Sequence, residues 1–236
     1  LIAPGLHNIG VMLPYTGLHF MLFDGIKEPA FIMTSANPPN EPIVTENEEA
    51  VKKLGSLVDY LLFHNRLIAH CCDDSVARLH DSENVSLIRR SRGYAPEPIR
   101  LKWQFEKCVL GLGAELNSTS CILHKGKAFM SQHVGDVENL ETLQFHKNAI
   151  KHLLRLTNTR PHAMACDLHP KFATTLLAQE LGENFDVPVS RIQHHHAHVA
   201  ALMAESCMDE IIAVVCDGYG YGSDGQAWGG EVLLFS

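Results

Sequence analysis

Four histidines stand within five consecutive positions of this chain, at the start of a segment whose pattern predicts a helix. The segment is RIQHHHAHVAALMAE, residues 191–205, and the histidines are His194, His195, His196 and His198. Residues four apart are neighbours on one face of a helix, so His194 and His198 can turn toward a single ion while the two histidines between them diverge from it. The spacing therefore suits a pair of metal ligands.

A carboxylate that could join this pair lies further along, where a predicted strand ends. Asp217 closes the apolar run AVVCD and opens a Gly-rich stretch. Two histidines and an aspartate form a frequent ligand set for a divalent metal. An alternative is a helix start whose histidines cap, hydrogen-bond or face solvent, and the residues alone leave it open. A zincin protease is excluded, because it needs glutamate directly after the first histidine and position 195 is histidine.

Glycines follow predicted strands at two places that lie about a hundred residues apart. Gly111 and Gly113 interrupt KCVLGLGAELNSTSCIL, and Gly218, Gly220 and Gly222 interrupt EIIAVVCDGYGYGSDGQAWGGEVLLF. Glycine allows a close backbone approach and the φ values that anion-binding nests require. We therefore expect two related halves that face one another with a nucleotide between the two bends, although an ordinary hairpin turn without a ligand would show the same pattern.

The elements that would position these groups alternate between strand and helix, which predicts an α/β fold. The segment EPAFIMTSANPPNEPIV, residues 28–44, has the pattern of an apolar strand running into a loop that three prolines keep irregular. Residues 45–62 show a helical pattern with Thr45 as its N-cap. Further along, the pattern predicts a domain boundary near 96–106, helices at 138–156 and 171–182, and a strand at 162–170.

The charge and composition argue against several classes of function. A formal net charge of −8 disfavours a face that neutralises many nucleic-acid phosphates. No apolar run approaches the roughly 20 residues that span a bilayer, and no secretory pattern opens the chain. Seven cysteines without a CxxC spacing fit reduced thiols, so we expect a cytoplasmic protein with neither a membrane nor a nucleic-acid partner.

The two ends of the sequence predict a segment of a longer protein. The sequence begins with LIAPGLHNIG, without methionine, and stops within the apolar run EVLLF. We therefore expect sheets with unpaired edges beside exposed apolar surface. We also expect this chain to be catalytically inactive and prone to association on its own.

Eight phrases follow one another over nearly the whole chain: TSANPPNEPI, DDSVAR, RRSRGYAPEPI, GLGAELNST, SQHVGDVEN, CDLHPKF, QHHHAHVAA and DGYGYGSDGQAWGGE. Together they resemble the HypF family of hydrogenase-maturation carbamoyltransferases. The resemblance implies that residues 1–100 are the C-terminal part of a YrdC-like mixed α/β domain. It also implies that residues 107–236 are the N-terminal part of a TsaD-like nucleotide-binding domain with the actin/Hsp70 fold.

The resemblance further implies an ATP-dependent carbamoyltransferase. Such proteins form carbamoyl-adenylate from carbamoyl phosphate and ATP, and they pass the carbamoyl group to the C-terminal cysteine of the partner HypE. The YrdC-like half would perform the adenylation, in which positioned cations and donors stabilise charge on phosphate oxygens. A solvated basic face is the alternative for any one of the arginines. The residues assigned by the resemblance are Ser75, Arg78, Arg90 and Arg92 for catalysis, and Ser35 and Asn37 for the nucleotide.

The TsaD-like half would bind the adenylate between its Gly-rich bends and would hold a divalent metal, which could be zinc, iron or magnesium. The family's metal-binding positions correspond to His194, His198 and Asp217, and a further carboxylate would follow residue 236. His195 and His196 receive no role beyond packing at the helix start or contacts behind the ligands. The glycines assigned to the nucleotide are Gly111, Gly113, Gly218, Gly220 and Gly222.

Two other functions stay open. An enzyme that uses threonylcarbamoyl-adenylate to modify tRNA shares both domain types, but the acidic balance and the phrases QHHHAH and CDLHP disfavour it. The second is a non-catalytic nucleotide-binding scaffold. An assay of ATP–pyrophosphate exchange with carbamoyl phosphate, compared with threonine plus bicarbonate, separates these functions.

Overall fold

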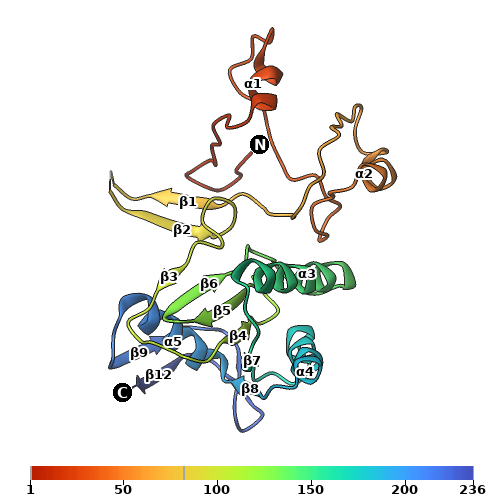
Figure 1. The fold of residues 1–236 in the computed structure, drawn as a ribbon. Helices are drawn as coiled ribbons and strands as arrows, with labels where there is room; N and C mark the ends of the chain where they lie inside the picture. The colour runs from red at the N-terminus through yellow and green to blue at the C-terminus, as the bar shows by residue number, and fades with distance from the viewer. Residues whose placement is uncertain (1, 82, 236) are drawn as a thin grey trace. The chain divides into compact units, whose positions relative to one another are not determined.

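The computed structural model describes residues 2–81 and 83–235, which form five helices and twelve short strands (Figure 1). The predicted mixed α/β class is therefore confirmed. The chain divides into two compact units, one ending at Ala36 and the other beginning at Asn37, and each is described by itself. No helix in the described part of the chain combines the length and the apolar character needed to cross a membrane.

The first unit carries one short helix and lacks the strand predicted before the proline-rich loop. Helix α1 spans Gly17–Phe23 and begins where Oγ1 of Thr16 accepts a hydrogen bond from the N–H of His19. The apolar run at 28–33 forms no strand, so that prediction is wrong. A strand is stabilised by ladder hydrogen bonds to a neighbour, and none of the described residues pairs with this run, where Ile32 is 80% exposed.

Helix α2, Asn47–Leu54, opens the regular structure of the second unit and is shorter than predicted. Glu46 stands at the N-cap and makes no side-chain capping bond, so the expectation that Thr45 caps the helix is wrong. The helix stops before Gly55, whose low helix propensity is not offset by packing, since Leu54 is the one buried residue of α2. Acidic side chains in the first turn and lysines in the last turn complement the helix dipole.

A two-stranded hairpin follows. Strand β1, Val76–Leu79, pairs antiparallel with β2, Val85–Arg89. Its turn is organised by the Asp81 carboxylate, which accepts hydrogen bonds from the backbone N–H groups of Glu83 and Asn84 and from the Asn84 side chain. These bonds, that of the Asn84 side chain first, hold the pKa of Asp81 below its usual range.

A six-stranded sheet lies at the centre of the second unit, in the order β3-β6-β5-β4-β7-β8. Strands β4, β5 and β6 pair antiparallel, whereas β4, β7 and β8 run parallel. The helices predicted at 138–156 and 171–182 and the strand at 162–170 are confirmed with small differences at their ends. The bounds are β3 Ile99–Arg100, β4 Val109–Leu112, β5 Ser120–His124, β6 Lys127–Met130, α3 Leu140–Thr157, β7 Ala163–Asp167, α4 Ala173–Phe185 and β8 Val189–Ile192.

The hydrophobic core of this unit joins the sheet to α3 and α4. Leu110, Ile122 and Met164 contribute from three adjacent strands, and Ile150 and Leu177 contribute from the two helices. Each of these side chains is at most 2% exposed. Because the core immobilises the parallel strands, it also fixes the positions of the residues that follow the carboxyl ends of β7 and β8.

The remaining chain forms helix α5 and two small antiparallel pairs. The predicted order of strand, Gly-rich turn and strand is confirmed as the pair β9 and β12, with the short ribbon of β10 and β11 between them. One face of the β9–β12 pair exposes Ile212, Val214, Val232 and Leu234, each at least 70% accessible. The bounds are α5 His194–Ser206, β9 Ile211–Val215, β10 Gly220–Tyr221, β11 Ala227–Trp228 and β12 Glu231–Phe235.

Candidate functional site

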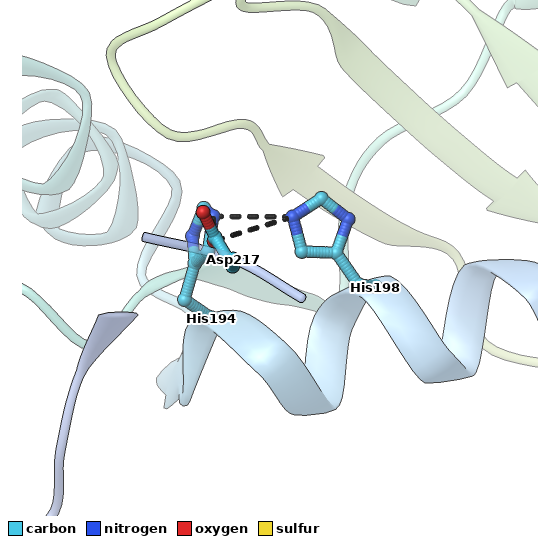
Figure 2. Close-up of side chains that lie close together, drawn as sticks. All are labelled: His194, His198 and Asp217. Atoms are coloured by element: carbon cyan, nitrogen blue, oxygen red, sulfur yellow. Dashed lines mark hydrogen bonds and ion pairs between the residues drawn. The ribbon is translucent and has the colours of Figure 1, made fainter. Parts of the chain in front are cut away.

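The two histidines predicted as ligands lie in the first two turns of α5, directly after β8. Gln193 is the N-cap of this helix, and its side-chain oxygen accepts a hydrogen bond from the backbone N–H of His196 at 3.0 Å. This cap ends the extended chain at Gln193 and starts the helix at His194. His194 and His198 therefore project from one face of α5, as the sequence predicts (Figure 2).

Asp217, which follows β9, completes a group of three converging side chains (Figure 2). Its Oδ2 lies 3.1 Å from Nε2 of His194 and 3.9 Å from Nε2 of His198. The two Nε2 atoms are 3.2 Å apart. Two imidazole nitrogens and a carboxylate oxygen at such distances need a proton or a cation between them, so this donor set fits a divalent metal.

Asp167 stands behind this group and was missed by the sequence analysis. It is the last residue of β7, its side chain is 4% exposed, and its Oδ2 lies 2.7 Å from Nδ1 of His194. In the β7–β8 ladder Asp167 pairs with Ile192, and the helix starts two residues later. An aspartate at the carboxyl end of a parallel strand is the signal that could have identified it.

The hydrogen bond from Asp167 determines how His194 presents its second nitrogen. This bond raises the pKa of His194 above its usual value, and burial partly opposes the rise. With Nδ1–H donated to the Asp167 carboxylate, the neutral ring has its lone pair on Nε2, which is the atom that faces Asp217. Carboxylate, histidine and metal are commonly arranged in this order in metalloproteins.

The environment of His198 differs from that of His194. Burial, followed by the positive charge of His194, lowers the pKa of His198 below its usual value. A lower pKa keeps the imidazole neutral at higher proton concentration, which is the form that binds a metal. His198 is also one of the residues around a cavity of about 360 Å³ beside β9, together with Asp217.

The other two histidines of the cluster have separate environments. His196 contacts Phe235 of β12 edge-on, with ring centroids 5.4 Å apart. His195 is completely buried, and its Nε2 lies 3.8 Å from Oδ2 of Asp217. His195 thus lies close to Asp217 but outside the group of three converging ligand atoms, as its divergence from the ligand pair on the helix predicts.

The glycines predicted to bind a nucleotide are placed differently from one another. Gly111 lies within β4, where it pairs with strands on both sides, and not in a bend as expected. The N–H of Gly113 donates to the Thr119 carbonyl, and the N–H of Gly222 donates to the Gln226 carbonyl. These N–H groups are therefore satisfied by the hairpins themselves.

Gly218 and Gly220 flank the metal-ligand group more closely. Gly218 follows Asp217 directly, and a Cβ there would meet no atom within 4 Å. A Cβ on Gly220 would lie 2.8 Å from Nε2 and Cε1 of His195. The ribbon β10–β11 therefore passes against the buried imidazole at a position where only glycine fits.

Three of the predicted catalytic residues gather around the turn that follows β2. Oγ of Ser75 donates to the Arg92 carbonyl and accepts from the N–H of Ser91, both at 2.8 Å. The Arg90 guanidinium donates to the carbonyls of Tyr94 and Glu97 at 3.0 and 2.9 Å. These bonds give Ser75 and Arg90 a structural role in shaping the turn, in addition to any catalytic one.

Arg92 belongs to that turn, whereas Arg78 and Asn37 lie on other segments of the same unit. Arg92 donates to the Cys72 carbonyl at 2.9 Å. Arg78 is exposed on β1, in register with Ser86. The Asn37 amide donates to the carbonyls of Pro38 and Glu41 and so organises the proline-rich loop. Ser35 belongs to the first unit and is exposed there.

Comparison with protein families places two kinds of domain on this chain. Residues 104–205 match the family described as the HypF Kae1-like domain, and residues 213–236 match the second subdomain of the carbamoyltransferase Kae1-like domain. Residues 1–91 match the Sua5/YciO/YrdC family, described as telomere recombination. The candidate metal ligands thus fall within the two Kae1-like matches.

Individual relatives extend over nearly the whole chain. A probable carbamoyltransferase HypF of Methanocaldococcus jannaschii is 48% identical over 98% of this chain, and a carbamoyltransferase HypF of Rhizobium leguminosarum bv. viciae is 38% identical over 99%. The chain spans only 30% and 31% of the lengths of these two relatives.

Solved structures of HypF proteins also match nearly the whole of this chain, and the chain again covers only part of each of them. The crystal structure of T. kodakarensis HypF matches with a TM-score of 0.91 and 44% identity, over 99% of this chain and 31% of that one. A full-length HypF in a phosphate- and nucleotide-bound form matches with a TM-score of 0.89 and 39% identity, over 99% of this chain and 30% of that one.

Proposed function

The chain belongs to the HypF carbamoyltransferase family, and we propose that it contributes to an ATP-dependent carbamoyl transfer. In the proposed reaction, hydrolysis of carbamoyl phosphate releases phosphate and carbamate, an oxygen of carbamate attacks the α-phosphorus of ATP, and pyrophosphate leaves. The thiol of the C-terminal cysteine of HypE then attacks the carbamoyl carbon, and AMP leaves. The similarity to carbamoyltransferases supports the transfer of a carbamoyl group, and we propose the adenylate intermediate and the HypE acceptor in addition.

The observation that carries this proposal is the convergence of His194, His198 and Asp217 within the Kae1-like part of the chain. Their three ligand atoms lie within 4.8 Å of one another. A divalent ion held there would supply positive charge that neutralises phosphate oxygens of a bound adenylate. Zinc, iron and magnesium are candidates, and the two nitrogen donors favour zinc or iron over magnesium.

Residues of this chain would orient the ligands and attract the cation before substrate binds. Asp167 holds His194 in the tautomer whose Nε2 lone pair faces the other ligands. Asp217 provides the negative charge that makes the site attractive to a cation. Because α5 is capped by Gln193 and β7 is buried, both imidazoles are positioned before any ligand binds.

The adenylation step would use the other half of the chain. Developing charge on the α-phosphate needs positioned donors, and Arg78, Arg90 and Arg92 are the cations that the family resemblance assigns. Arg90 donates to the Tyr94 carbonyl and Arg92 donates to the Cys72 carbonyl, and these contacts hold the two guanidinium groups in place. Ser35 and Asn37 would contact the nucleotide from the proline-rich loop.

Exchange of labelled pyrophosphate into ATP tests the proposal in the protein that contains this chain. Carbamoyl phosphate should support exchange, whereas threonine plus bicarbonate should not; the reverse preference would favour the tRNA-modifying reaction. Arg90→Ala should abolish exchange, with the exposed Arg100→Ala as a matched control. Asp217→Asn should spare exchange and block carbamoyl transfer to a HypE peptide thiol. Loss of both activities in both variants would contradict the division into two sites.

A further inference from the structure

His195 is a buried imidazole whose two nitrogens have very different surroundings. The residue is 0% exposed. Its Nδ1 lies 3.3 Å from the side-chain nitrogen of Gln193, whereas its Nε2 has no hydrogen-bond partner among the described residues. Leaving a buried polar atom without a partner is energetically unfavourable. Such an atom beside a functional group calls for a specific explanation.

The helix cap determines which nitrogen of His195 carries the proton. The side-chain oxygen of Gln193 accepts the backbone N–H of His196, so the amide nitrogen is the end that faces His195. An amide nitrogen donates and does not accept, so Nδ1 of His195 is the acceptor. In a neutral imidazole with an accepting Nδ1, the proton resides on Nε2.

The resulting N–H group lies beside the carboxylate of the candidate site. Oδ2 of Asp217 is 3.8 Å from Nε2 of His195. Gly220 lies at the same Nε2–Cε1 edge of the imidazole, where a Cβ would come within 2.8 Å of both atoms. The buried ring therefore packs against the Gly220 backbone with its Nε2 proton beside Asp217.

We propose that His195 is a positioning residue: its Nε2–H faces the Asp217 carboxylate at 3.8 Å, and a small approach of Asp217 on binding a cation would close this gap to a hydrogen bond that fixes the orientation of the carboxylate. The cap residue Gln193 sets the tautomer that makes this possible. The inference rests on the proposed role of Asp217 as an ion ligand. Helix α5 would then have two functions: His194 and His198 bind the cation directly, while His195 orients Asp217, the third ligand.

Two substitutions of His195 separate donation to Asp217 from simple filling of space. The amide of His195→Gln can place a donor near the position of Nε2, whereas the shorter His195→Asn reaches only the position of Nδ1. Zn²⁺ affinity, measured by competition with a chromophoric chelator, should fall about 10- to 100-fold in His195→Asn. It should stay within about threefold of the original in His195→Gln, and thermal melting should show both variants folded.

A spectroscopic measurement tests the tautomer without any metal. Long-range ¹H–¹⁵N correlation spectra of the unsubstituted, metal-free protein that contains this chain should show His195 protonated on Nε2 alone. Protonation on Nδ1, or unchanged Zn²⁺ affinity in a folded His195→Asn variant, would overturn the inference. Failure of the proposed metal site is distinguishable, because His198→Ala would then retain Zn²⁺ affinity whatever the tautomer of His195.

Discussion

Replacing Asp167 with asparagine should weaken metal binding although Asp167 itself contacts no metal. Both oxygens of Asp167 accept hydrogen bonds: Oδ1 from the N–H of His169 at 2.8 Å, and Oδ2 from Nδ1 of His194 at 2.7 Å. An asparagine amide has one accepting end, so it can satisfy only one of these two donors. If the amide nitrogen faces His194, the imidazole must turn its lone pair to Nδ1, and the lone pair on Nε2 is lost.

The expected loss follows from the role of partners behind metal-bound histidines. Their removal typically lowers metal affinity about 10- to 100-fold, which corresponds to about 1–3 kcal/mol. Competition of Zn²⁺ between the chain and a chelator measures this directly. Asp186→Asn is the matched control, because it makes the same chemical change at the exposed left-handed C-cap of α4. An Asp167→Asn variant with the original Zn²⁺ affinity would refute the role assigned to Asp167.

Two other outcomes follow from buried groups. His146 is buried, its Nε2 lies 2.7 Å from Oγ of Ser120, and burial lowers its pKa to about 4. Below about pH 6.5 the unfolded chain therefore binds more protons at this histidine than the folded chain does. The free energy of unfolding should fall by about 3 kcal/mol as the pH drops from about 6.5 to about 4. Urea titrations at pH 7.5 and pH 5 should show this loss of stability, and His146→Leu should reduce its dependence on pH. The same pH dependence in the His146→Leu variant would contradict the assignment to His146. Gly220→Ala should lower Zn²⁺ affinity because the added Cβ would meet His195, while Gly218→Ala should leave the affinity unchanged. Equal Zn²⁺ affinities of the two variants would show that the close contact between Gly220 and His195 is unimportant for metal binding.

Local patterns in the sequence predicted much of the site. The i, i+4 spacing of His194 and His198 needs only a helix, and the apolar run before Asp217 needs only a strand, so both placements follow from short-range periodicity. Their convergence with Asp217 is a tertiary fact, which the sequence pattern left open and the family resemblance favoured. The structure agrees with all three placements.

The parts that the sequence did not predict depend on contacts between distant elements. Asp167 and His194 are 27 positions apart and meet because β7 and β8 are parallel neighbours. For His195 the sequence predicted only packing or a contact behind the ligands, and its 3.8 Å distance from Asp217 depends on how β9 and α5 meet. Gly111 was predicted to lie in a bend because it is a glycine, but it lies in a paired strand. Residue type alone does not distinguish these two positions.

The same reasoning explains the errors outside the site. The apolar run at 28–33 has the composition of a strand, but strand formation requires a partner that none of the described residues provides. Helix α2 ends at Leu54 because the apolar positions predicted beyond it, such as Leu57, remain exposed. In both segments the local pattern was present and the packing that would stabilise it was not.

The most direct test of the central claim is the metal content of the protein that contains this chain, with and without the two histidine ligands. After equilibration with Zn²⁺ and removal of free metal, elemental analysis should find about one ion per chain, since the three ligand atoms converge on one point. The His194→Ala, His198→Ala double variant should contain almost none while remaining folded by circular dichroism. His196→Ala, which alters a histidine that packs against Phe235, should retain the ion. An unchanged metal content in the double variant would contradict the proposed metal centre.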